Sequence, residues 1–132
     1  MRRTFPRQID SLQAIVAYVR EFVAREGPAG EAAPDLDLVL EELFTNMIRH
    51  GHGGDVEIAL ERGSSGVMAE LREHGARPFD PTALPELDAE SPLSRRRPGG
   101  LGLHLVRRLT TAFRYEYRDG VGVTRVVLRE PR

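Results

Sequence analysis

The chain of 132 residues has no cysteine, which excludes disulfide frameworks, thiol nucleophiles and cysteine-bound zinc. It also has no lysine, because all 19 basic residues are arginine. A Walker-type phosphate loop needs a lysine after its glycines, and the protein-kinase fold needs a lysine on a strand, so both are excluded. Schiff-base chemistry is excluded with them. Arginine, whose planar fork binds phosphate and carboxylate bidentately, must carry the positive charge.

Long apolar runs are missing too. No stretch approaches the length of a membrane span, and the N-terminus lacks the apolar run of a signal peptide, so the expected location is cytoplasmic. A net charge of -1 gives no argument for a nucleic-acid or membrane partner. With 40% hydrophobic and 30% charged residues, the composition is globular, and the length fits one domain over residues 1–132.

The hydrophobic pattern predicts alternating helical and extended segments. In chain order we first expect an edge strand within residues 2–8 and a helix from Asp10 and Ser11 to about Gly27. A second helix is capped by Asp35 and ended by the glycines at 51–54, and strands at 55–61 and 67–73 follow, joined by a hairpin. The chain then continues with a helix at 101–111 and with strands at 113–118 and 122–129, joined over Asp119 and Gly120. Residues 75–98 form a long loop, a length typical of a functional lid or a disordered segment.

The helix that carries Glu42 has the most informative polar face. Glu42, Asn46 and His50 follow one another at intervals of four residues and therefore share one face. A carboxylate and a carboxamide one turn apart are a proton acceptor and a neutral oxygen ligand, a pairing that suits phosphoryl transfer with Mg²⁺. Taken alone, the same face also fits a solvent-exposed side of an amphipathic helix.

Two glycine-containing motifs follow. Glu73 stands at a strand end just before Gly75, where a carboxylate could accept a hydrogen bond from an amino-bearing ring and the glycine would allow a close approach. Gly100 and Gly102 open a helix, whose exposed N–H groups can bind an anion. The arginines at 95–97 precede them. Each motif also has an interpretation without a ligand. Glu73 and Gly75 could mark a plain strand-to-turn transition, Gly100 and Gly102 a flexible hinge, and the arginines at 95–97 a solvated loop.

In their order along the chain, these motifs resemble the GHKL ATP-binding fold, and most closely the anti-sigma factor serine kinases. Residues 42–50 resemble the N-box of that family. Residues 73–81 resemble the first glycine box, residues 100–106 the second, and residues 123–126 the final strand. The resemblance spans nearly the whole chain and implies an α+β fold, a two-layer α/β sandwich with a mostly antiparallel mixed sheet and helices on one face.

The resemblance also implies roles for single residues. Asn46 would ligate the Mg²⁺ that bridges the ATP phosphates, and Glu42 would be the general base that deprotonates the incoming serine. Glu73 takes the place of an aspartate that accepts the adenine amino group. Gly75 would let the ring lie close to the backbone, and Thr124 would support that contact.

The phosphate end of the implied site lies around the second glycine box. Gly100 and Gly102 would present N–H groups to the phosphates, under an ATP lid at residues 76–98. The other residues expected to contact the nucleotide are Pro78, Arg97, Leu101 and Leu103. The chain departs from the family at Glu73, because the extra methylene forces the carboxylate to fold back or the adenine to shift. We therefore expect weaker or altered nucleotide binding.

The implied function is ATP-dependent phosphorylation of a serine on a STAS-domain anti-sigma factor antagonist, coupled to mutually exclusive binding of a sigma factor. The family's relatives form dimers, which leaves a homodimer open for this chain. One alternative is a non-catalytic, partner-switching protein that sequesters its partner, and Glu73 favours it. Another is the ATPase half of a histidine kinase, which would have to act in trans because no dimerisation helices with a phosphoacceptor histidine precede it.

Overall fold

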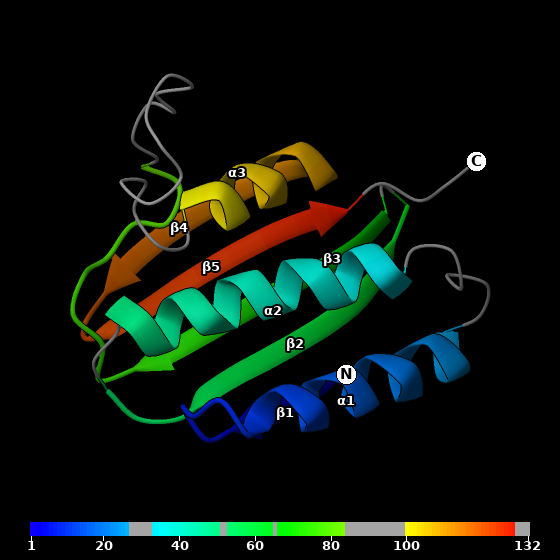
Figure 1. The fold of residues 1–132 in the computed structure, drawn as a ribbon, viewed down its shortest axis with the longest axis horizontal. Coiled ribbons are helices and arrows are strands. Elements are labelled where there is room, and N and C mark those ends of the chain that lie inside the picture. Colours follow the sequence, from blue (N-terminus) through cyan, green and yellow to red (C-terminus); the bar gives the residue numbers. More distant parts are fainter. Residues whose placement is uncertain (27–32, 51–52, 65, 84–99, 129–132) are drawn as a thin grey trace.

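A computed structural model describes residues 1–26, 33–50, 53–64, 66–83 and 100–128. Three helices cover one face of a five-stranded sheet and leave the other face open (Figure 1). The elements in chain order are β1 (Arg2–Phe5), α1 (Ser11–Glu26), α2 (Ala33–His50), β2 (Val56–Gly63), β3 (Gly66–His74), α3 (Gly100–Leu109), β4 (Thr110–Arg118) and β5 (Val121–Leu128). The predicted α+β, two-layer class is confirmed.

The sheet has the order β1-β2-β3-β5-β4, and each of the strand pairs that the structure describes is antiparallel. β1 is an edge strand, as expected for residues 2–8. Two hairpins form where turn residues predicted them, and the second turns over Asp119 and Gly120, whose φ angles are 51° and 79°. Both angles lie in the left-handed region that a tight hairpin of this hand requires.

Two predicted boundaries were wrong. The last helix ends at Leu109, and Thr110 and Thr111 begin β4 instead of ending α3. Both are β-branched and suit a strand, and the Thr110 hydroxyl donates to the Val106 carbonyl at 2.8 Å, next to an irregularity in the β4–β5 register. Asp35 does not precede α2 as a cap but lies in its first turn, where a carboxylate still opposes the helix dipole.

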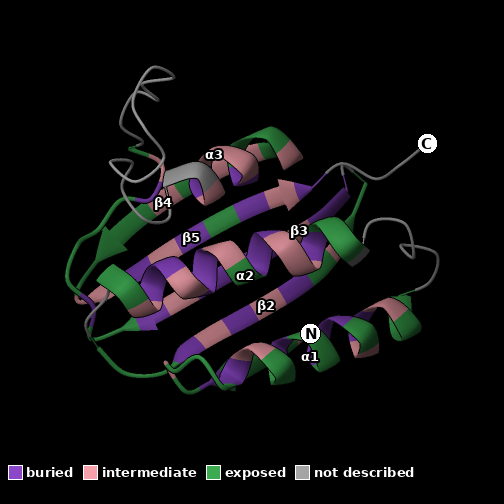
Figure 2. Cartoon of the chain, viewed as in Figure 1, coloured by how far each residue is buried: buried purple, intermediate pink, exposed green. Residues whose placement is uncertain are grey.

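The core lies between the helices and the sheet, where Figure 2 shows burial concentrated. α2 runs across the middle of the sheet and buries an apolar face that consists of Leu36, Leu40, Leu43 and Met47. Strands alternate between buried and less buried residues, as a sheet covered on one face requires. Because α2 lies over the centre of the sheet, its polar face lies next to the C-terminal end of β3 and the N-terminal half of β5.

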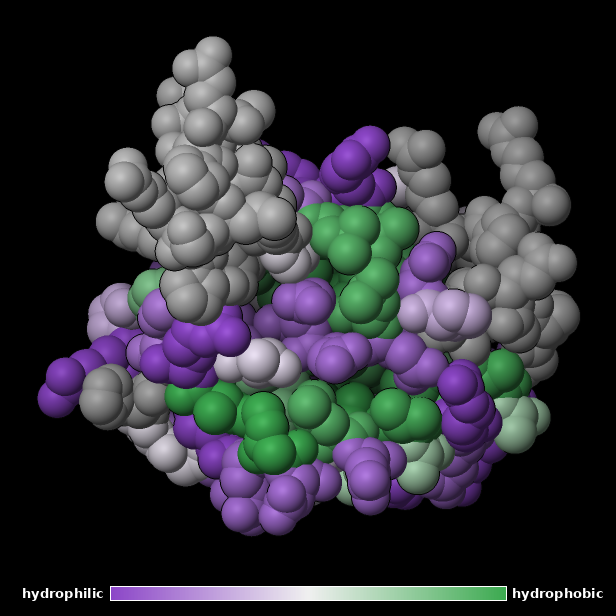
Figure 3. Space-filling model, viewed as in Figure 1, coloured by the Kyte–Doolittle hydropathy of each residue, from purple (hydrophilic) through white to green (hydrophobic). Residues whose placement is uncertain are grey.

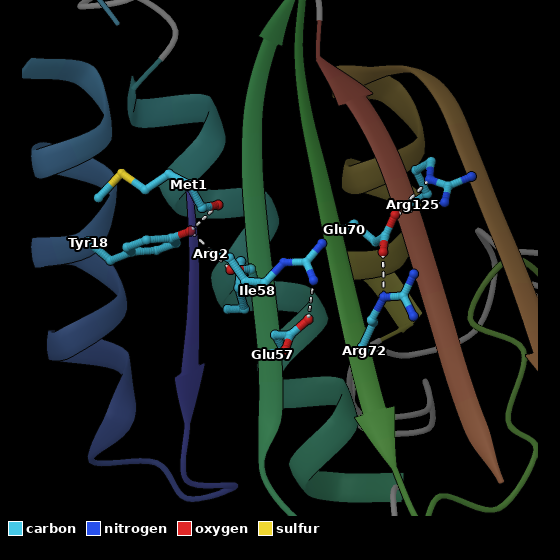
Figure 4. Close-up of polar contacts among 8 residues, drawn as sticks. All are labelled: Met1, Arg2, Tyr18, Glu57, Ile58, Glu70, Arg72 and Arg125. Atoms are coloured by element: carbon cyan, nitrogen blue, oxygen red, sulfur yellow. Dashed lines mark hydrogen bonds and ion pairs between the residues drawn. The ribbon is translucent and has the colours of Figure 1, made fainter. Parts of the chain in front are cut away.

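The N-terminal strand is held in place by Tyr18 on α1. Its hydroxyl lies 2.7 Å from the Met1 carbonyl oxygen and 3.0 Å from that of Ile58, as Figure 4 shows. Burial raises the pKa of Tyr18 to about 12. On the same side of the molecule, apolar surface gathers along α1 (Figure 3), the helix that exposes Val16.

The open face of the sheet is charged. Glu70 of β3 accepts hydrogen bonds from Arg72 at 2.6 Å and from Arg125 of β5 at 2.7 Å, and Arg2 pairs with Glu57 at 3.4 Å (Figure 4). Among the described residues, no helix is long and apolar enough to cross a membrane.

Candidate functional site

The polar face of α2 points toward the ends of the central strands. Asn46 is buried, Glu42 is half-buried, and His50 is exposed at the last turn of the helix. The His50 ring stacks on Phe79, with ring centroids 4.6 Å apart and planes 8° from parallel. The three polar side chains on this face of α2 therefore differ in environment, from half-buried Glu42 through buried Asn46 to exposed His50.

A small cavity lies beside Asn46. Its volume is about 10 Å³, and it is lined by Leu43, Asn46, Met47, Glu73, Phe79, Pro81 and Thr124. Such a volume holds about one water molecule. Three residues that sequence reasoning predicted from distant parts of the chain, Asn46, Glu73 and Thr124, thus meet around one space. A purine ring is larger than this volume, so it fits there only if lining residues move.

Glu73 is buried at the end of β3 and paired with Arg7. The Arg7 guanidinium donates to Glu73 Oε2 at 2.9 Å, and each of the two side chains is only 10% exposed. Burial raises the pKa of the Glu73 carboxyl, while the hydrogen bond and charge of Arg7 act in the opposite direction. The other carboxylate oxygen, Oε1, makes no hydrogen bond to any residue that the structure describes.

Arg7 was missed by sequence reasoning. It lies between β1 and α1, and it also donates to the carbonyl oxygens of Met47 at 2.8 Å and Gly54 at 3.1 Å. Its remaining nitrogen, Nη2, is buried without a hydrogen-bond partner within the described part of the chain. The only available signal was indirect, because a glutamate buried at a strand end needs a cation. Nothing in the sequence says which arginine supplies it.

Thr124 carries a second unsatisfied group. The residue is fully buried on β5, opposite Leu71 of β3 and Tyr115 of β4, and its Oγ1 has no hydrogen-bond partner among the described residues. A buried hydroxyl without a partner costs about 1–3 kcal/mol. Together with the free Oε1 of Glu73, it gives the cavity polar atoms that a base with an amino group and ring nitrogens can satisfy. The residues therefore fit an adenine nucleotide.

Glu42 meets the start of α3. A Cβ atom placed on Gly102 would lie 1.8 Å from Glu42 Oε2 and 2.6 Å from its Cδ, so any larger residue there would require the Glu42 side chain to move. The carboxylate of α2 and the first turn of α3 are therefore in direct contact. Leu103, next to Gly102, is buried in the core and does not point to this contact.

The segment that follows β3 is tied to the β4–β5 hairpin. The Ala76 N–H donates to the Gly120 carbonyl at 3.0 Å, and the Tyr117 hydroxyl donates to the Ala76 carbonyl at 2.9 Å. The Phe79 N–H donates to the Tyr115 hydroxyl at 3.1 Å. Aromatic residues alternate along β4 with a period of two, so the sequence did hold a signal for this contribution.

Two predicted residues of this segment sit apart from the cavity. Pro78 is exposed and does not line it, whereas Phe79 and Pro81 do. Gly75 has a φ of +69°, so its role is the sharp turn at the end of β3. Gly53 packs on that turn, where a Cβ would lie 2.6 Å from the His74 carbonyl oxygen. Sequence reasoning had treated Gly53 only as part of a helix end.

Other predictions fall outside the described residues. They are Arg97, with the other lid residues from 84 to 98, and the side chain of Leu101. Gly100 and Leu101 belong to the first turn of α3, and the burial of neither is described. For a metal, Asn46 offers a carboxamide oxygen near the Glu42 carboxylate on the same helix. Mg²⁺ is often held by one or two protein ligands plus substrate phosphates and water, so this sparse donor set fits it. No group of three His, Asp or Glu side chains gathers among the described residues.

Residues 5–129 match the family model described as the histidine kinase-like ATPase domain. A curated relative, the serine/threonine-protein kinase BtrW of Bordetella bronchiseptica, is 30% identical over 89 residues, which cover 64% of this chain and 62% of that protein. The match thus spans less than two thirds of the relative's length. Among solved structures, the histidine kinase AdeS of Acinetobacter baumannii is similar to all of this chain and 68% of its own, with a TM-score of 0.53 and 15% identity, which is a likeness of fold.

Proposed function

Because this chain belongs to the histidine kinase-like ATPase domain family, we propose that it binds ATP with Mg²⁺ and phosphorylates a serine of a STAS-domain anti-sigma factor antagonist. The printed name of the relative BtrW, a serine/threonine-protein kinase, supports serine or threonine as the acceptor. A phosphorylated antagonist carries added negative charge, which would weaken its hold on this protein and leave a sigma factor bound instead.

The observation that carries the proposal is the contact between Glu42 and Gly102. A proton acceptor on α2 lies against the N-terminal turn of α3, where backbone N–H groups favour the negative charge of phosphates. Asn46 is one helical turn away from Glu42, next to the cavity of Glu73 and Thr124. Base, metal ligand and nucleobase pocket thus follow one another along α2.

The residues divide the transfer between them. Glu42 accepts the proton of the serine Oγ as that oxygen forms a bond to the γ-phosphorus, while the bond from the γ-phosphorus to the β,γ-bridging oxygen breaks and ADP leaves. Asn46 would hold Mg²⁺, which neutralises charge on the phosphate oxygens when bound. The first turn of α3, with Gly100 and Gly102, would hold the phosphates.

Transfer from γ-labelled ATP to a purified STAS-domain protein tests the proposal. Glu42→Gln keeps the side-chain shape but removes the base, and we expect the rate of transfer to fall at least a hundredfold with ATP affinity nearly unchanged. Glu41→Gln is the matched control, since Glu41 is the exposed neighbour on the same helix. Acid-stable phosphate on the acceptor supports serine, and acid-labile phosphate would point to a histidine kinase.

A second variant tests the contact itself. Gly102→Ala places a methyl group where Glu42 Oε2 now lies, so the carboxylate must move, and we expect transfer to fall about tenfold or more. Gly63→Ala is the control, because a Cβ there has its nearest neighbour, the Gly66 carbonyl oxygen, at 3.7 Å. Equal rates for the two glycine variants would contradict the role of the contact.

The other candidate function is partner binding without kinase turnover. It is favoured by the cavity of about 10 Å³ and by the Glu73 carboxylate, one oxygen of which is already bound by Arg7. Calorimetry with ATP and Mg²⁺ separates the two functions. Absence of binding at millimolar nucleotide would contradict the kinase and leave the binding protein.

A further inference from the structure

We propose that Arg7 is a positioning residue of the nucleobase pocket, which holds one oxygen of Glu73 so that the other faces the base. This inference rests on the proposed function, since it concerns the same nucleotide. Its starting point is geometric: the two oxygens of the Glu73 carboxylate have different surroundings. Oε2 bonds Arg7, which enters from the segment between β1 and α1.

The second oxygen turns toward β5. Glu73 lies opposite Gly122 in the register of β3 and β5, and a Cβ atom on Gly122 would lie 3.6 Å from Glu73 Oε1. The Tyr115 hydroxyl is 3.2 Å from the same Cβ position. Glycine at 122 thus places no side chain between Oε1 and the Tyr115 hydroxyl. On the same face of β5, two residues further on, Thr124 lines the cavity, and its hydroxyl has no hydrogen-bond partner among the described residues.

The free atoms define which base fits. Oε1 of an ionised carboxylate only accepts hydrogen bonds, and a threonine hydroxyl can donate one. A purine with an amino group at position 6 donates to such an oxygen and offers a ring nitrogen to a hydroxyl. A purine with a carbonyl there places an acceptor against the carboxylate and leaves both unpaired, at a cost. The pocket therefore selects a 6-amino purine, provided that Oε1 stays in place.

Arg7 supplies that condition. A glutamate has one more rotatable bond than an aspartate, so its carboxylate needs a second anchor to keep one orientation. The planar guanidinium bonds Oε2, the Met47 carbonyl and the Gly54 carbonyl together, which fixes Arg7 against the last turns of α2 and the turn before β2. By holding Oε2, Arg7 thereby keeps the side chain of Glu73, which is one methylene longer than that of aspartate, from extending toward the base.

The experiment compares affinities for ATP and for purine riboside 5′-triphosphate, which lacks the 6-amino group, by calorimetry with Mg²⁺. For the native chain we expect ATP to bind about tenfold or more tightly than the analogue, the worth of a hydrogen bond to a charged group. Arg7→Lys keeps a positive charge beside Glu73 but cannot make the three bonds of the fork. We expect it to lower the ratio to about threefold or less and to change the affinity for the analogue less than twofold.

Two further variants separate positioning from structure. Arg7→Lys with Glu73→Asp shortens the acidic side chain, so the carboxylate no longer needs the fork and the ratio should return toward tenfold. Arg2→Lys is the matched control, since Arg2 belongs to the same N-terminal segment but pairs with Glu57 on the open face. It should leave both affinities unchanged.

The outcomes are distinct. An unchanged ratio in Arg7→Lys, or equal losses for both nucleotides, would mean that Arg7 is only a structural cross-link and would overturn the inference while leaving the proposed function standing. Absence of ATP binding to the native chain would overturn the proposed function and this inference together. A ratio that falls in Arg7→Lys and returns in the double variant supports the positioning role.

Discussion

Two buried glutamates, three residues apart on β3, differ in their hydrogen-bond partners and in the direction of their pKa shifts. Glu70 faces the open side of the sheet and Glu73 faces the helices. Burial alone would raise the pKa of Glu70, but hydrogen bonds from Arg125 and Arg72 hold that pKa below its ordinary value. For Glu73, burial outweighs the single arginine and the pKa is raised.

The two glutamates differ in how many of their carboxylate oxygens accept hydrogen bonds. Both oxygens of Glu70 accept hydrogen bonds, from partners at the solvent boundary, and Arg125 is 46% exposed. Glu73 lines a cavity and has one oxygen bonded to a buried arginine, while the other makes no hydrogen bond to any residue that the structure describes. A fully paired carboxylate holds strands together, whereas a buried carboxylate oxygen without a partner costs stability, which fits the proposed role of Glu73 in binding a base.

Removing the arginine partner gives the largest expected contrast. Arg7→Met leaves the Glu73 charge buried without the one cation that pairs with it in the described part of the chain, and we expect the free energy of unfolding to fall by about 3–5 kcal/mol. Arg125→Met leaves Arg72 still paired with Glu70, and the arginine that is removed is itself 46% exposed, so we expect a loss of about 1 kcal/mol or less. Urea unfolding followed by circular dichroism measures both. Similar losses would mean that the two pairs are equivalent and that the comparison fails.

The unpaired hydroxyl next to Glu73 gives a smaller effect. Thr124→Val removes a buried hydroxyl that has no hydrogen-bond partner among the described residues, so we expect a gain in stability of about 1 kcal/mol, together with weaker ATP binding. Thr4→Val, at an exposed position of β1, is the control and should change neither quantity. A Thr124→Val variant that is less stable would show that the hydroxyl already has a partner.

The pH dependence gives the smallest effect, and its sign differs between the two sites. Since the folded-state pKa of Glu70 is lowered, its stabilisation is present above the unfolded-state pKa, near the ordinary value of 4.5, and is lost as the pH falls through the folded-state pKa. Since that of Glu73 is raised, its contribution is fully present below the unfolded-state pKa and is lost as the pH rises through the folded-state pKa.

Variants with a neutral glutamine at each position measure the sign of each pH-dependent contribution to stability. Relative to the native chain, Glu70→Gln should lose stability as the pH rises from below 4.5 to 7, and Glu73→Gln should gain it. Melting temperatures of the three proteins over this pH range provide the measurement. Slopes of the same sign for the two variants would contradict the assigned directions of the pKa shifts.

Much of this arrangement was predictable because it depends on local pattern. The face of α2 follows from spacing, the hairpin over Asp119 and Gly120 from turn chemistry, and the meeting of Asn46 with Glu73 from the motif order that resembles the GHKL fold. The α3–β4 boundary was misplaced because two β-branched threonines continue the helical spacing while favouring a strand.

The remaining features depend on contacts between distant residues. Arg7 and Glu73 are 66 positions apart in sequence, and nothing near Arg7 marks it among 19 arginines. The contact of Phe79 with His50 joins a loop to the end of α2, and periodicity predicts neither its distance nor its geometry. Only the folded chain shows that Glu73 is half-paired.

The three bonds of Arg7 also constrain the order in which this pocket could be acquired. An ancestor with the aspartate of the resembling family at position 73 could accept arginine at position 7, since the two backbone carbonyls of Met47 and Gly54 already offer it partners. A glutamate arriving first would be buried with neither anchor nor counter-charge. We therefore expect related sequences with glutamate at this position to carry arginine at the other, whereas the reverse need not hold.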